Sequence, residues 1–193
     1  LVCCAVDAFT HLFEAYLSSK GNAFTRQTAI SGMLAFARGW PQLTESGSQG
    51  DRAREQMMLA SWLGGQSLSM AGLGVIHGIA GELGAIKDYH HGEVCGRLLL
   101  PFLTLLDESP HPQQAVLMQE LNFALFQQTS EQPAEQLKQW LMANAGLVFW
   151  QDLQPLSVDE VDWILLRSNS KNSLVSYSRE QQRWMLEQAY RIG

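Results

Sequence analysis

The sequence is 193 residues long, with 46% hydrophobic and 17% charged residues, which is typical of one globular domain with a substantial core. Its net charge is −6 and its 13 Lys and Arg side chains are scattered, so no basic surface for nucleic acid is indicated. Polar residues interrupt every apolar run well before the roughly 20 residues that a membrane-spanning helix needs.

The three cysteines, Cys3, Cys4 and Cys95, form neither an even disulfide set nor a Cys-x-x-Cys metal motif. A reducing, cytoplasmic setting is therefore expected. The sequence starts with Leu1 inside the apolar run LVCCAVDAF, whereas a natural N-terminus is usually polar and loose. We therefore expect this chain to be a piece of a longer protein.

Hydrophobic residues recur with helical spacing through the first half of the chain. Helices are predicted, in chain order, over residues 7–19, 24–39 and 52–71, over the glycine-rich segment 72–92, and over 93–106. The Pro-, Gly- and Ser-rich segment 40–51 is predicted to be a loop. The third helix is apolar nearly all round from Met57 to Leu63, which predicts a central, buried position. Pro101 is expected to kink or break the fifth helix.

Helix start and stop signals continue in the second half of the chain. The turn SPHPQQ precedes a helix to about Gln128, and Pro133 suits the first turn of another helix, which Gly146 could end. Two capping boxes precede the last two predicted helices: Ser157 with Glu160, and Ser178 with Gln181. No pair of strands is indicated, so the prediction is an all-α helical bundle that forms one domain over residues 1–193.

Asp7 and His11 lie four residues apart in the helical stretch AVDAFTHLFEAY, so both can face one metal ion. Alone, such a pair often arises by accident, and an Asp–His hydrogen bond would explain it. His77 lies in an apolar segment, and His91 follows with thirteen residues between them. Buried polar groups need partners, and one divalent cation would satisfy all of these side chains. Imidazole and carboxylate ligands suit Fe(II), Zn or Mn.

Other motifs fit less well. An HExxH metalloprotease motif is absent, and a ferritin-type di-iron site needs two ExxH elements, whereas this chain has one, Glu108 to His111, with Pro110 inside it. The glycine pair in segment 72–74 fails the GxGxxG spacing of a dinucleotide loop, and no strand precedes it.

Taken together, these segments resemble the C-terminal helical domain of the iron-containing (group III) alcohol dehydrogenases, in the dehydroquinate synthase-like superfamily. DAFTHLFEAY resembles the first metal-ligand helix of that family, and AREQMMLASWLGG resembles its long central helix. GLGVIHGIAGELGA and HHGEVCGRLLLP resemble its signature around the later ligands. SVDEVDWILLRSNSKNSL and YSREQQRWMLEQAY resemble its closing helices. The likeness is most specific in residues 5–16 and 72–101.

The resemblance implies four metal ligands: Asp7, His11, His77 and His91. It implies that His90 is a neighbour of the site, that Fe(II) is the usual metal with zinc as the alternative, and that NAD or NADP exchanges a hydride with a small alcohol or aldehyde. The ion would polarise the substrate oxygen as a Lewis acid. A homodimer is compatible with this interpretation.

Two departures from the family qualify this expectation. Many members carry another histidine four residues after the third ligand, where this chain has Gly81, so no proton-relay role is assigned there. The N-terminal α/β half that binds the dinucleotide in the family is absent from this chain, so the isolated chain is expected not to turn over an alcohol.

Two alternatives stay open. One is a stand-alone helical metal-binding or interaction module without redox chemistry. The other is a glycerol dehydrogenase-like or dehydroquinate synthase-like relative with three protein ligands and zinc, although His11 as a fourth ligand favours iron.

Overall fold

A computed structural model describes residues 1–144 and 153–192 of the chain. The described residues form nine α-helices and one 3-10 helix, in the order α1 (Val2–Tyr16), α2 (Ala23–Gly39), η1 (Trp40–Gln42), α3 (Gly47–Ala71), α4 (Val75–Gly84), α5 (His91–Glu108), α6 (Pro112–Phe126), α7 (Pro133–Met142), α8 (Val158–Arg167) and α9 (Arg179–Arg191). Within these ranges the structure has no strand beyond an isolated bridge between Ser18 and Ser173. The predicted all-α fold is confirmed.

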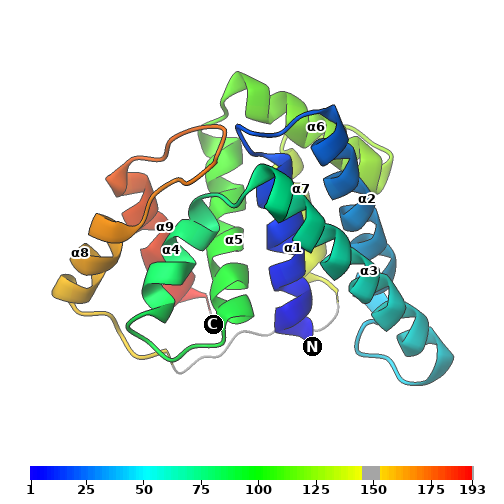
Figure 1. Cartoon of the computed structure of the whole chain (residues 1–193), viewed down its shortest axis with the longest axis horizontal. Coiled ribbons are helices and arrows are strands. Elements are labelled where there is room, and N and C mark those ends of the chain that lie inside the picture. Colours follow the sequence, from blue (N-terminus) through cyan, green and yellow to red (C-terminus); the bar gives the residue numbers. More distant parts are fainter. Residues whose placement is uncertain (145–152, 193) are drawn as a thin grey trace.

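Helices α1 and α5 lie at the centre of the bundle (Figure 1). Helices α2 and α3 pack together and against one side of α1, whereas α4, α8 and α9 lie beyond α5 on the other side. None of the described helices is long and apolar enough to cross a membrane.

The core is built around the apolar side chains of α1. Phe9, Leu12, Phe13 and Tyr16 are fully buried at the spacing of one helix face. The ring of Phe9 lies 4.8 Å from that of Phe36 on α2, between centroids. Each such side chain contributes about 1.5–3 kcal/mol when it leaves water, so this face fixes α1 firmly in the bundle.

Most predicted helix starts are confirmed. Ser157 and Ser178 each accept a hydrogen bond from the backbone three residues later, and each forms the expected capping box. Pro133 occupies the first turn of α7, as predicted. A third capping box, Asn22 with Thr25, begins α2 and was not predicted. The predicted helix end at Gly146 lies outside the described residues.

Several predictions about helix limits were wrong. The helix expected over 72–92 is shorter, because α4 begins at Val75 and ends at Gly84. The loop expected over 40–51 contains η1, and α3 already begins at Gly47. Helix α1 begins at Val2 and ends at Tyr16, because the Ser18 hydroxyl donates to the Ala71 carbonyl and the chain turns away there. The break considered at Pro101 does not occur, because α5 continues past this residue to Glu108, and a kink there stays a prediction.

The prediction that α3 is buried all round was also wrong. Met57 and Ala60 face α1 and α2, but the opposite face is open to solvent, with Met58 75% exposed and Trp62 61% exposed. The helix is apolar nearly all round because one face packs in the bundle and the other face is apolar but exposed. The second face is open because α3 lies at the edge of the bundle (Figure 1).

Candidate metal centre

Three helices bring the predicted ligand side chains together. Helix α1 supplies Asp7 and His11, α4 supplies His77, and α5 supplies His91 at its first residue. Asp7 Oδ1 lies 3.4 Å from His77 Nε2 and 3.9 Å from His91 Nε2. The three side chains are close enough to share one ion although they are far apart in sequence.

His11 has a different relation to this group. Its Nε2 lies 3.8 Å from Asp7 Oδ1, and its ring stacks on that of His77 with 4.7 Å between centroids. It lies beside the site, but it is not in the set of side chains whose ligand atoms are all mutually within 4.8 Å. That set contains Asp7, His77, His91 and Cys95.

Cys95 is the first site residue that the sequence analysis missed. Its Sγ lies 3.5 Å from His91 Nε2 and 3.6 Å from His77 Nε2, and the side chain is fully buried. Cys95 follows His91 by four residues on α5, the same spacing that links Asp7 to His11 on α1. That spacing was the available signal.

Glu14 is the second missed residue. Its buried carboxylate lies 2.7 Å from His77 Nδ1 and accepts a hydrogen bond of 2.6 Å from the Ile76 amide. A carboxylate here satisfies the first free amides of α4 and fixes the ring of His77. Because a carboxylate can only accept, the proton of neutral His77 lies on Nδ1 and its Nε2 lone pair faces the site. Glu14 follows His11 by three residues on one helix face, which was the signal for it.

Two glycines allow these close approaches. A Cβ at Gly74 would lie 2.7 Å from Glu14 Oε1, so a side chain there would displace the carboxylate that caps α4. A Cβ at Gly92 would lie 2.3 Å from the Cys3 carbonyl oxygen and 3.2 Å from the Asp7 Cβ. Gly92 therefore lets the start of α5, with His91, reach α1.

The donor atoms at this site fit a divalent cation. Asp7 Oδ1 is shielded from solvent, and no described group donates a well-formed hydrogen bond to it. When its imidazole is neutral, His77 accepts at Nε2 because Glu14 holds the proton on Nδ1, and His91 accepts at Nε2 in the tautomer that carries its proton on Nδ1. Three converging acceptors with little to donate to them are the arrangement that a bound cation would satisfy.

The pKa shifts follow from the same arrangement. Burial lowers the pKa of His11 and of His91, against the attraction of Asp7. Burial alone would raise the pKa of Asp7, but the imidazoles around it, His77 first, hold it below its usual value. Burial also opposes a charge on His77, yet Asp7, Cys95 and Glu14 together raise its pKa. The acidic groups around His77 therefore favour a positive charge here, which the second proton of His77 supplies when no metal ion is bound and which a bound cation would supply beside neutral His77.

Comparisons with known proteins identify the family of this chain. A sequence model for the C-terminal part of the Fe-containing alcohol dehydrogenase family matches residues 1–161. The chain belongs to this family. The prediction from the sequence motifs is confirmed at this level.

Curated members of the family include enzymes from bacteria and yeast. The chain is 33% identical to 1,3-propanediol dehydrogenase of Citrobacter freundii over 162 residues, which are 82% of this chain and 41% of that protein. It is 27% identical to alcohol dehydrogenase 4 of Saccharomyces cerevisiae over 192 residues, which are 96% of this chain and 49% of that protein. The chain thus spans about half the length of the curated relatives it matches.

Solved structures give the same picture of the fold. A 1,3-propanediol oxidoreductase superposes with a TM-score of 0.80 at 25% identity, covering 97% of this chain and 51% of that one. An iron-containing alcohol dehydrogenase superposes with a TM-score of 0.75 at 23% identity, covering 100% of this chain and 49% of that one. The predicted assignment to the helical C-terminal fold of this superfamily is confirmed.

Gly81, where the family resemblance led to the expectation of a histidine, lies on α4 one turn beyond His77. A Cβ built at Gly81 meets no atom within 4 Å, so the position opens onto unfilled space. The departure from the family pattern therefore removes a side chain without leaving a packing defect in the described residues.

Replacing Glu14 with glutamine is expected to weaken metal binding by about 10- to 100-fold, the usual effect of losing a supporting carboxylate. Glutamine keeps the size of the side chain but lacks the charge that holds His77 Nδ1–H. Competition with a chromophoric chelator measures the affinity. Glu82→Gln, on α4 but outside the ligand group, is the control and should bind as the wild type does; equal affinities for both variants would contradict the role of Glu14.

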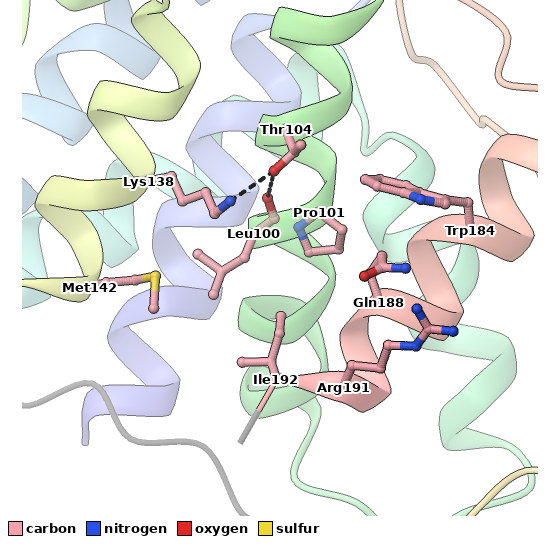
Figure 2. A pocket seen from close by; sticks show the side chains of 9 residues that line it. All are labelled: Leu100, Pro101, Thr104, Lys138, Met142, Trp184, Gln188, Arg191 and Ile192. Carbon is pink, nitrogen blue, oxygen red and sulfur yellow. Dashed lines mark hydrogen bonds between the residues drawn. The ribbon is translucent and has the colours of Figure 1, made fainter.

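A surface pocket, hereafter called the hollow, lies away from the group of candidate metal ligands. It has a volume of about 330 Å³ and opens between α5, α7 and α9 (Figure 2). Lys138 points into it, but its ammonium group donates to Thr104 Oγ1 at 2.9 Å (Figure 2). The same ammonium group pairs with Glu135 Oε2 at 3.2 Å. These two contacts already satisfy the ammonium group of Lys138. None of the candidate metal ligands lines this hollow.

Proposed function

We propose that this chain is the metal-binding half of an NAD(P)-dependent alcohol dehydrogenase, which interconverts a small alcohol and an aldehyde or ketone. The observation that carries the proposal is the convergence of Asp7 Oδ1 with His77 Nε2 and His91 Nε2, in a chain of the Fe-containing family. Fe(II) is the metal we propose, after the family name, with zinc as the alternative. A divalent ion here would supply Lewis acidity at the oxygen of the substrate.

Each side chain of the group has a distinct part in this proposal. Asp7 gives the anionic oxygen, and His77, which is 4% exposed, gives an imidazole whose orientation Glu14 fixes. His91 is 49% exposed, so the group is open to solvent on its side. An alcohol would approach there, and the buried side would exclude water from the other ligands.

The dinucleotide is proposed to bind mainly outside this chain. The relatives are about twice as long as the chain, and the described residues hold no strand that could carry a nucleotide-binding turn. Hydride transfer needs the reacting carbon of the alcohol and the nicotinamide to be held in contact. The metal-binding half alone therefore lacks a reaction partner.

The isolated chain, loaded anaerobically with Fe(II), is accordingly expected to show no turnover of short alcohols with NAD or NADP. The absorbance of reduced nicotinamide gives the measurement. The control is the coding sequence upstream of Leu1: if it encodes a nucleotide-binding half, the joined protein should be active under the same conditions. Normal turnover by the isolated chain would contradict the proposal that the dinucleotide binds mainly outside it. A joined protein that binds metal but has no dehydrogenase activity would favour a metal-binding module without redox chemistry.

A further inference from the structure

We propose that Lys171 binds an anionic group of the substrate, so that the alcohol handled at the metal site carries a carboxylate or a similar negative group. The proposal rests on the proposed function, because it assumes that the substrate oxygen binds at the metal ion, and it adds the chemical class of the substrate. That class is a short hydroxy acid or the corresponding aldehyde acid, with its oxygen at the ion and its charged end at Lys171.

Backbone contacts hold Lys171 against the start of α4. Lys171 lies in the connection between α8 and α9, which passes beside the start of α4 (Figure 1). The amide of the next residue, Asn172, donates to the Leu73 carbonyl oxygen at 3.0 Å. Two residues before Lys171, the backbone of Asn169 lies so close to α4 that a Cβ at Gly78 would stand 2.0 Å from the Asn169 carbonyl oxygen. Gly78 therefore lets this turn of the chain reach the helix.

The same contacts place Lys171 beside the candidate metal ligands. Leu73 and Gly78 lie on either side of His77 in the chain, so the turn that carries Lys171 spans the part of α4 that holds this ligand. Burial is the largest influence that lowers the pKa of His91, and the positive charge of Lys171 lowers it further. Because His91 is 49% exposed, this charge acts at the open side of the group.

The side chain of Lys171 is available to a ligand. It is exposed, and no group among the described residues forms a hydrogen bond or an ion pair with its ammonium group. The φ angle of Lys171 is 44°, in the left-handed region that residues other than glycine seldom adopt. Its amide donates to the Asn169 side-chain oxygen at 2.8 Å, which helps to hold this conformation. A backbone that surrounding contacts hold in such a region is common where a side chain is positioned for a function.

An anionic substrate makes the best use of this arrangement. A neutral alcohol would interact with the metal ion alone, whereas a hydroxy acid would offer its oxygen to the ion and its carboxylate to Lys171. A hydrogen bond between ammonium and carboxylate is charge-assisted and stronger than a neutral one. Because Lys171 acts at the side from which an alcohol would approach, its charge would also attract such a substrate to the site.

Binding to the Co(II)-loaded chain tests the proposal without any need for turnover. The visible d–d bands of bound Co(II) are followed while 3-hydroxypropionate, or the neutral 1,3-propanediol, is added. The wild type should prefer the hydroxy acid, and Lys171→Gln should reduce this preference about fivefold, the factor that two unit charges about 4 Å apart gain in water. Lys171→Arg should keep the preference. Lys20→Gln, which removes an exposed lysine from the connection between α1 and α2, is the matched control and should keep it too.

Salt and a dinucleotide fragment complete the test. The part of the preference that depends on Lys171 should disappear as the salt concentration rises from about 0.01 to 1 M, because the screening length falls from about 30 to 3 Å. The same preference in the wild type and Lys171→Gln would overturn the proposal and leave the metal site intact. Weaker binding of ADP, but not of 3-hydroxypropionate, by Lys171→Gln would assign the lysine to the dinucleotide and also overturn it. A chain that binds no Co(II) would overturn both this proposal and the metal site.

Discussion

Replacing His77 with alanine is expected to abolish tight metal binding by this chain. His77 is the most buried imidazole of the group, and its Nε2 lies 3.4 Å from Asp7 Oδ1 and 3.6 Å from Cys95 Sγ. Water cannot readily replace it there, because the side chain is 4% exposed and apolar residues of α4 surround it. Elemental analysis after anaerobic loading should show a single equivalent of metal in the wild type and background metal in the variant.

The fold is expected to survive this change. Glu14 keeps its hydrogen bond from the Ile76 amide when His77 is removed, so α4 stays capped. Circular dichroism should therefore show a helical protein that lacks metal. His90→Ala, one residue before His91 and exposed, is the matched control and should retain the metal. Loss of metal from both variants, or retention by both, would count against the assignment of His77.

The second large effect concerns stability. Arg97 and Glu93 form an almost fully buried ion pair on α5, with Nε and Oε1 3.1 Å apart. The Arg97 guanidinium also donates to the carbonyls of Ala189 and Ile192, which holds the end of α9 against α5. Arg97→Met is expected to lower the free energy of unfolding by about 3–5 kcal/mol, because it removes one member of a buried ion pair together with its bonds to the end of α9. In a thermal melt this corresponds to a fall of about 6–20 °C.

An exposed pair provides the comparison. Arg183 on α9 and Asp162 on α8 form an ion pair with Nη2 and Oδ1 2.5 Å apart, and both side chains are largely open to solvent. Arg183→Met should cost only about 0–1 kcal/mol, because water screens such a pair. If both variants lose the same free energy of unfolding, burial of the Arg97–Glu93 pair does not determine its contribution to stability.

Much of the fold follows from local signals in the sequence. Capping boxes at Ser157 and Ser178, and a proline at the start of α7, begin helices where the sequence predicts them, since these signals act within one turn. The solvent-exposed face of α3 could not be predicted, because an apolar side chain such as Trp62 does not reveal whether a partner covers it. Which element packs on which face is decided by the whole bundle.

The candidate metal site, like the fold, was predictable from the sequence only in part. Histidines and an aspartate with family spacing indicated that Asp7, His77 and His91 meet, and they do. Glu14 and Cys95 were missed because each sits among apolar residues on a buried face, where a single polar side chain is easily attributed to the core. Only the approach of α4 and α5 to α1 shows that both point at His77.

The most direct test of the central claim, that this group of side chains holds one divalent ion, is the metal content of the wild-type chain. Protein purified anaerobically, loaded with Fe(II) or zinc and freed of loose metal by gel filtration should retain a single equivalent per chain. A chain that stays helical but retains no metal above background from either ion would contradict the account.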